Sequence, residues 1–113
     1  MGVPQKGHVE HVGLSRAVAE FPTSISDDIV VDASMPGTLA WYVNMRGCTE
    51  IGARSAIRYN VNTKRLQHVK RVVLGSDGNA KVQYVYYRGK QNAKQYSSSE
   101  LNAVKRDLRE KIK

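Results

Sequence analysis

Cysteine is almost absent from this chain of 113 residues, in which Cys48 is the single example. One cysteine cannot form an internal disulfide, and it excludes a zinc site built from several cysteines. Since such low cysteine content is typical of a reducing compartment, we expect a cytoplasmic protein. The chain also lacks an apolar run near the roughly 20 residues that cross a bilayer, and its first residues lack the apolar stretch of a signal peptide. We therefore expect no membrane partner.

Internal repeats and low-complexity segments are also missing. The composition, 41% hydrophobic and 25% charged, is ordinary for a globular protein and argues against a disordered chain or a coiled coil. A chain of this length forms one domain at most. We expect residues 1–13, which are rich in glycine, histidine and polar side chains, to form a flexible N-terminal arm. Residues 14–113 should then form a single domain.

Negative charge is scarce in the second half of the chain. The formal net charge is +8. Residues 1–52 contain three basic and six acidic side chains, a net charge of −3, whereas residues 53–113 contain fifteen basic and four acidic side chains, a net charge of +11. Such asymmetry indicates a polyanionic partner such as a nucleic acid. The alternative is that the positive charge only keeps the domain soluble.

The first half of the chain has short segments of modest pattern. Residues 14–21 suit two helical turns that Pro22 would end, because the residue before a proline is pushed out of the helical region. Apolar residues within 25–32 indicate a short strand. Residues 38–45 carry aromatic and apolar side chains, which predict another strand.

The most regular pattern lies in residues 55–96. Ile57, Tyr59 and Val61 alternate with polar neighbours, which is the period of a half-buried strand. Turn residues occupy 75–79 and 89–92, and Asp-Gly in the first turn accommodates positive φ. The further strands that we expect in this region are residues 66–74, 81–88 and 93–96.

A helix is predicted at the C-terminus. Ser97 and Glu100 have the spacing of a capping box. Apolar residues then recur at spacings of three and four, namely Leu101, Val104, Leu108 and Ile112. Together these elements predict an α+β fold, a small and strongly curved antiparallel sheet or an SH3-like barrel of about five strands with a C-terminal amphipathic helix.

The candidate metal and catalytic groups are weakly patterned. His8 and His11 flank Glu10, but a zinc protease motif needs histidines four apart on a helix and a third ligand. Cys48 could act as a nucleophile only with a base such as His68 beside it. The acidic cluster of Asp27, Asp28 and Asp32 is more typical of a solvated edge than of a magnesium site. We expect no cofactor, no metal and no enzymatic activity.

One segment resembles the microbial guanyl-specific ribonucleases. Residues 71–78, followed by a tyrosine-rich strand, are similar to part of that family. Its members need a glutamate base and a histidine acid across one sheet. Here no histidine follows His68, and no glutamate lies between Glu50 and Glu100. The family is not assigned, but a metal-independent ribonuclease that stabilises phosphate charge with Lys, Arg and Tyr stays open as the third hypothesis.

The strongest functional pattern is the basic, tyrosine-containing region. Its basic residues alternate with apolar residues or lie in turns, so most of them should face solvent. Exposed tyrosines beside cations are typical of surfaces that bind single strands, where bases stack on rings and phosphates meet charges. The predicted contacts are Arg58, Lys64, Arg65, Lys70, Arg71, Lys81, Arg88 and Lys90, with Tyr87 as a stacking residue.

The leading hypothesis is therefore a small, non-enzymatic nucleic-acid-binding protein. Its binding to RNA or DNA would be mainly electrostatic and weakly sequence-specific. The second hypothesis is a protein–protein assembly or adaptor module, such as an accessory protein of a phage or mobile element. That module would use the apolar stripe of the C-terminal helix, or would form a homo-oligomer through its oppositely charged halves.

Overall fold

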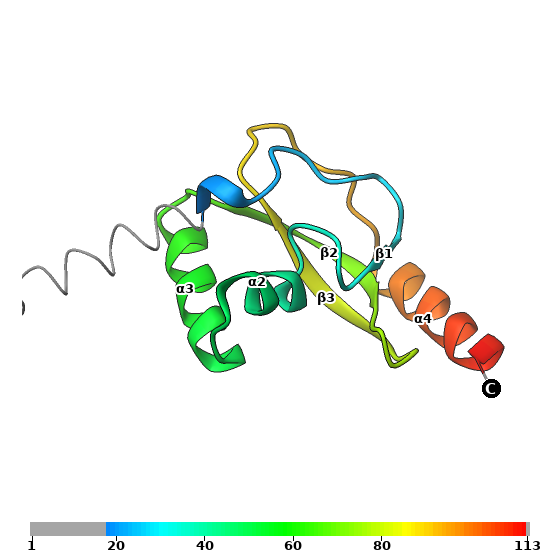
Figure 1. Cartoon of the computed structure of the whole chain (residues 1–113). Coiled ribbons are helices and arrows are strands. Elements are labelled where there is room, and N and C mark those ends of the chain that lie inside the picture. The colour runs from blue at the N-terminus through cyan, green and yellow to red at the C-terminus, as the bar shows by residue number, and fades with distance from the viewer. Residues whose placement is uncertain (1–17, 113) are drawn as a thin grey trace, which may run out of the picture.

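The computed structural model of the protein describes residues 18–112 and places a three-stranded sheet between helices (Figure 1). A helical turn at residues 18–20 comes first. The elements that follow are β1 (Val30–Asp32), α2 (Leu39–Arg46), α3 (Glu50–Asn62), β2 (Gln67–Leu74), β3 (Ala80–Tyr87) and α4 (Ser98–Ile112). Helices α2 and α3 lie together toward one end of the sheet, and α4 lies toward the other (Figure 1).

The sheet has the order β1-β2-β3, with β2 in the centre. β1 runs parallel to β2, and β2 and β3 form an antiparallel hairpin in which Val69 is opposite Val85. The two hairpin strands and their turn were predicted, and the turn contains Gly78 at a φ of 85°. The α+β class is confirmed. The five-stranded barrel is wrong, because the sheet is open and contains three strands.

The predicted strand at residues 38–45 is helix α2. Thr38 begins this helix as its N-cap, with its side-chain oxygen accepting a hydrogen bond from the Trp41 N–H at 3.1 Å. Gly47 ends it in the left-handed conformation at a φ of 62°. Between these two caps, Tyr42 turns into the core and stacks on Phe21. Packing and capping outweigh the strand preference of the aromatic residues.

The alternating segment around residues 57–61 is also helical, within α3. Thr49 is its N-cap, and its hydroxyl accepts a hydrogen bond from the Gly52 N–H. The buried residues Ala53, Ile57 and Asn60 are spaced by four and three, so they lie on one face. Tyr59, whose side chain an alternating strand would bury with Ile57, is 46% exposed. The apolar period of two was accidental here, because only one of these apolar residues is fully buried.

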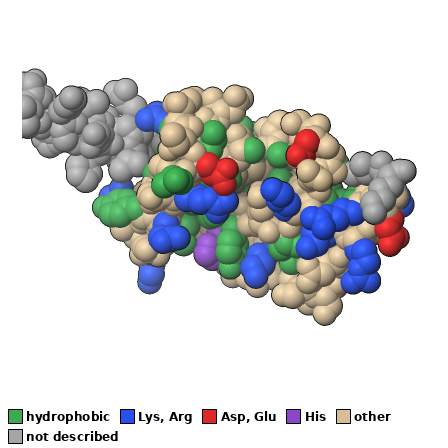
Figure 2. Space-filling model, turned by 90° about the horizontal axis from the view of Figure 1, so that it is seen from below, with side chains coloured by type: hydrophobic (Ala, Val, Ile, Leu, Met, Phe, Trp, Pro, Cys, Tyr) green, Lys and Arg blue, Asp and Glu red, His purple; other side chains and the backbone are tan. Residues whose placement is uncertain are grey.

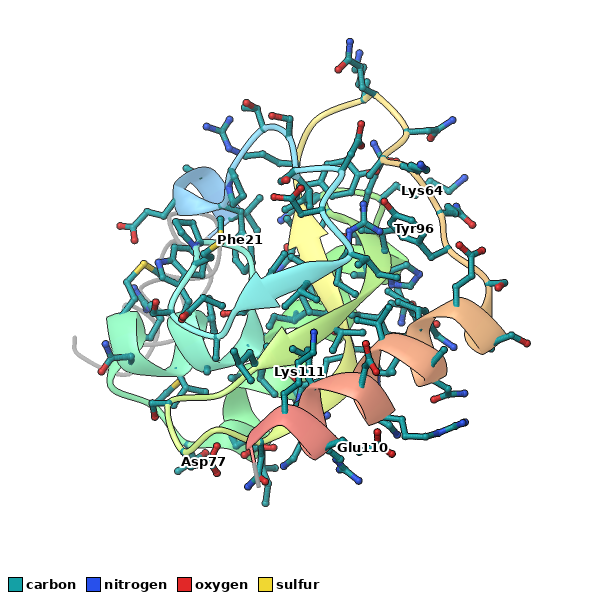
Figure 3. All side chains as sticks on the ribbon, turned by 90° about the vertical axis from the view of Figure 1, so that its right-hand side faces the viewer. Phe21, Lys64, Asp77, Tyr96, Glu110 and Lys111 are labelled. Atoms are coloured by element: carbon teal, nitrogen blue, oxygen red, sulfur yellow. The ribbon has the colours of Figure 1, made fainter. Side chains whose placement is uncertain are left out.

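Phe21 joins residues 18–29, below called the N-terminal segment, to helices α2 and α3, below called the two-helix unit. Its ring meets Trp41 edge-on at 5.1 Å between centroids and lies against Tyr42 at 5.5 Å. Ile57 and Leu66 complete the same cluster. Figure 3 labels Phe21 just after the short N-terminal helical turn. The predicted end of a helix before Pro22 is confirmed, whereas residues 14–17 and the predicted arm at 1–13 lie outside the described residues.

Helix α4 is capped as predicted and packs on the sheet. The Ser97 hydroxyl accepts from the Glu100 N–H at 3.1 Å and donates to the Glu100 carboxylate. Leu101 is fully buried against the hairpin residues Val72 and Ala80. Val104 and Leu108 extend this contact. Three residues of the apolar stripe that the second hypothesis offered to a protein partner, Leu101, Val104 and Leu108, therefore pack on the chain's own sheet.

The predicted last strand at residues 93–96 is wrong, because it makes no ladder with another strand. Side chains hold this segment instead. The Ala93 N–H donates to the Tyr87 hydroxyl at 3.1 Å, and the Tyr96 hydroxyl donates to the Asp27 carbonyl. The segment is thus an irregular connection between β3 and α4, held by Tyr87 at the end of β3 and by Asp27 in the loop before β1.

Gly37 makes a close backbone contact that supports a stability prediction. Its carbonyl accepts the Tyr86 N–H at 2.8 Å, which joins the start of α2 to β3. Its φ is 104°, and an added Cβ would lie 2.6 Å from the Tyr86 carbonyl oxygen. We expect Gly37→Ala to lower the free energy of unfolding in urea by about 2–4 kcal/mol.

The matched control is Gly47→Ala, which also has a positive φ but no atom within 4 Å of the added Cβ. It should cost only the conformational strain, about 1 kcal/mol. Equal losses for both variants would show that the contact between Gly37 and Tyr86 adds nothing.

Candidate nucleic-acid interface

A groove opens on the sheet face that α4 covers only in part. Its volume is about 410 Å³. The helix lies over the turn end of the hairpin, whereas His68, Lys70 and Tyr84, farther along the same face, are exposed. Lining the groove are His68, Val69, Lys70 and Tyr84 from the hairpin and Gln95, Tyr96, Ser97 and Ser98 from the connection into α4.

The floor of the groove consists of two aromatic rings and a cation. His68 and Tyr84 stack with ring centroids 4.2 Å apart and planes at 24°. The Lys70 ammonium lies 5.5 Å from the Tyr84 ring centre. Lys70 is directly opposite Tyr84 in the antiparallel register, and His68 is diagonal to it, so all three side chains project from one face. Tyr84 is 41% exposed, which leaves aromatic surface open to a ligand.

Helix α3 extends this face with two further cations. Arg54 and Arg58 are one helical turn apart and exposed. Both act on Tyr86, which follows Tyr84 on the same face of β3. Burial raises the pKa of the Tyr86 phenol, and the positive charges of Arg54 and Arg58 oppose that rise. Figure 2 shows Lys and Arg side chains spread around the purple side chain of His68, the one histidine in the described part of the chain.

The wall of the groove comes from the segment before α4. Figure 3 shows Tyr96 pointing inward from that segment. Its ring has the Arg71 guanidinium 5.1 Å away and the Lys94 ammonium 5.2 Å away. Lys94 is exposed and adds a cation at the rim.

The charge of this face is weakly compensated. Within residues 18–112 the ion pair formed is Arg54 with Glu50, at 2.7 Å and with both side chains more than half exposed. An exposed ion pair of this kind contributes little to stability and is screened by salt. The Glu100 carboxylate, near the groove, is engaged by Ser97 at the start of α4. We refer below to Arg54, Arg58, His68, Lys70, Tyr84 and Lys94 as the groove patch.

Two of the nine predicted contact residues belong to this patch, namely Arg58 and Lys70. Two others are buried, and the expectation that they face solvent is wrong: Arg71 is 0% and Tyr87 3% exposed. Both lie on the opposite face of the hairpin, which the N-terminal segment and the connection after β3 cover. The Tyr87 hydroxyl donates to the Gln67 side chain there. Neither side chain is available to a ligand in this structure.

The other predicted contacts are exposed but are not among the residues that line the groove. Lys81 projects from the hairpin face opposite to Lys70, because its position in the strand is odd and that of Lys70 is even. Arg88 donates from Nε to the Phe21 carbonyl at 2.7 Å, which ties it to the N-terminal segment. Lys64 and Arg65 lie in the turn between α3 and β2, and Lys90 follows β3.

Four residues of the groove patch were missing from the predicted contacts, and they are Arg54, His68, Tyr84 and Lys94. A hairpin register would have grouped the even-numbered residues His68, Lys70 and Tyr84 from the sequence. Arg54 could be found only once residues 50–62 were recognised as a helix. Lys94 reaches the groove through the irregular connection, which has no local signal.

The acidic cluster considered for magnesium does not form a metal site in the described residues. Among residues 18–112 no three His, Cys, Asp or Glu side chains gather into a metal site. Ser34 donates two hydrogen bonds to Asp32, and these lower the pKa of that carboxyl. Cys48 is exposed between α2 and α3. His8, Glu10 and His11 lie outside the described residues.

Comparisons with models of protein families, with curated proteins and with solved structures find no match to this chain. Within the described residues, no helix has the length and apolar character needed to cross a membrane. The functional inference therefore depends on the chemistry of the groove patch.

Proposed function

We propose that the protein binds single-stranded nucleic acid at the groove patch, without catalysis and with little sequence preference. The observation that carries this proposal is the exposed stacked pair of His68 and Tyr84 with Lys70 beside it. Aromatic rings that take a base and cations that take its phosphate are the two components of single-strand recognition.

An aromatic floor favours unpaired bases. In a duplex the flat faces of the bases are stacked on one another and cannot reach a side chain. A single strand can place one base over the exposed part of the Tyr84 ring, and the flexible Lys70 side chain can move from that ring to the adjacent phosphate.

The phosphates on either side of that base would meet the remaining cations of the patch. Arg54 and Arg58 lie on α3 within electrostatic reach of Tyr86, and Lys94 lies beside the Tyr96 ring. Arg54 would exchange Glu50 for a phosphate. These contacts follow the backbone and do not distinguish base edges, which is why little sequence preference is expected.

The test is fluorescence anisotropy with labelled single-stranded RNA, single-stranded DNA and duplex DNA. For four phosphate contacts the slope of log K against log salt is about −2.8 for a single strand, so affinity should fall about fiftyfold between about 50 and 200 mM salt. Lys70→Gln should make this slope shallower by about 0.7.

Arg109→Gln is the matched control, because Arg109 is an exposed cation on α4 about 16 Å along the helix from Ser98. It should leave the slope unchanged. Absence of binding at about 50 mM salt would overturn the proposal, and so would equal effects of the two substitutions.

A ribonuclease is a second candidate because the groove contains His68, an exposed imidazole close to Lys70 and Tyr84. In such an enzyme His68 would accept the proton of a ribose 2′-hydroxyl as its oxygen attacks phosphorus. The bond from phosphorus to the 5′-oxygen would break, that oxygen would leave with a proton from water, and Lys70 would stabilise the developing charge. A gel of the RNA samples distinguishes the two functions. Intact RNA supports binding alone. RNA that is shortened by the original protein but stays at full length with the His68→Asn variant supports cleavage.

A further inference from the structure

Arg71 is a buried cation without an acidic partner in the described residues. Its side chain is 0% exposed, and none of its nitrogens lies within ion-pairing distance of a carboxylate there. Burying an unpaired charge is costly, so its interactions with neutral groups must hold it in place. One terminal nitrogen donates to the Lys70 carbonyl at 3.0 Å, and the other donates to the Ser26 carbonyl at 3.2 Å. Its Nε has no hydrogen-bond partner among residues 18–112.

These contacts connect the floor of the groove to its wall. Arg71 neighbours Lys70 on β2, while its guanidinium lies against the ring of Tyr96. Tyr96 in turn donates its hydroxyl to the Asp27 carbonyl, in the same loop that Arg71 reaches through Ser26. The loop, the central strand and the groove wall are thus held together at one side chain.

We infer that Arg71 is a positioning residue that makes the groove selective for single strands over duplexes. This inference rests on the proposed function. With Tyr96 fixed, the wall from Gln95 to Ser98 confines the groove to about 410 Å³ above the aromatic floor. That space suits a flexible strand with one base on Tyr84, and it excludes the rigid backbone of a duplex from the rings. A duplex can still contact the exposed cations outside the groove.

The experiment compares the affinities of Arg71→Met and Arg71→Lys for a twelve-nucleotide thymidine strand and for a duplex of the same length. Methionine keeps much of the volume and removes the charge, whereas lysine keeps the charge but has one nitrogen for two carbonyls. Both variants should bind the single strand about fivefold more weakly, because the wall must be ordered on binding. Duplex affinity should stay within about twofold, so the preference for single strands falls.

A second readout separates positioning from direct contact. The salt slope for the single strand should be the same as that of the original protein, because Arg71 meets no phosphate. A slope that becomes shallower by about 0.7, as expected for Lys70→Gln, would assign Arg71 to direct contact and overturn the inference. An unchanged preference in a folded variant would overturn it as well.

Two further measurements keep the inference testable if the Arg71 variants do not fold. Tyr96→Phe removes the hydrogen bond to Asp27 and keeps the ring against Arg71, so a smaller loss of single-strand preference is expected. Amide exchange of residues 93–98 should become faster in every variant while β2 and β3 stay protected. Unchanged amide exchange in residues 93–98 would contradict the inference that Arg71 and Tyr96 hold the groove wall in place. If the original protein binds neither probe, the proposed function itself has failed, which is a different result.

Discussion

Tyr84→Ala is expected to weaken the binding of a single-stranded oligonucleotide by about fivefold or more, and to leave duplex binding nearly unchanged. Removing one aromatic side chain from a stacking site costs about 1–3 kcal/mol per base. Tyr84 is 41% exposed and already stacks on His68, so its ring is oriented before a base arrives. Anisotropy titrations at constant salt would measure the effect, and Tyr84→Phe should retain the affinity of the original protein.

Tyr59→Ala provides the matched control for this experiment. Tyr59 is a tyrosine of similar exposure, 46%, and it lies on α3 outside the groove. Its removal should change single-strand affinity by less than about twofold, because Tyr59 does not line the groove and points about 100° around α3 from Arg58. Equal losses for Tyr59→Ala and Tyr84→Ala would mean that the groove is not the binding surface.

Phe21→Ala should lower the free energy of unfolding by about 3–5 kcal/mol, the loss typical of truncating a buried phenylalanine. Phe21 is among the largest fully buried side chains and contacts both aromatic residues of α2. Its loss leaves a cavity between the N-terminal segment and the two-helix unit. Denaturation in urea, followed by circular dichroism and tryptophan fluorescence, should show a lower midpoint with a similar slope.

The control is Ile51→Ala, since Ile51 is 80% exposed in the first turn of α3. This substitution should change the free energy of unfolding by less than about 0.5 kcal/mol. A loss below about 1 kcal/mol for Phe21→Ala would show that the N-terminal segment contributes little to the core, contrary to the packing described above.

Local sequence signals were sufficient for the hairpin and the last helix. In residues 75–79 the turn residues are specific for a tight turn, and Gly78 adopts the positive φ that such a turn requires. The serine and glutamate at the start of α4 form a capping box within one helical turn. Each of these elements is stabilised by neighbours in the chain, so its residues predict it without knowledge of the rest.

Residues 38–62 could not be assigned in this way. Trp41 and Tyr42 have a strand preference, and Ile57, Tyr59 and Val61 alternate in the manner of a strand. Their helical conformation depends on the Thr38 and Thr49 caps and on contacts with Phe21, which is distant in sequence. The five-stranded barrel was wrong largely for this reason, since it counted two helices as strands, together with the irregular segment at residues 93–96.

The amino-acid sequence by itself determined the charge of this protein, the strands of its hairpin and its last helix, because these depend on composition and on near neighbours. It did not determine which tyrosines and cations are exposed. Tertiary structure buried Arg71 and Tyr87 under the N-terminal segment and left His68, Lys70 and Tyr84 open beside α4. Both faces of the hairpin carry basic and aromatic residues, so only the packing of distant segments decides which face meets solvent.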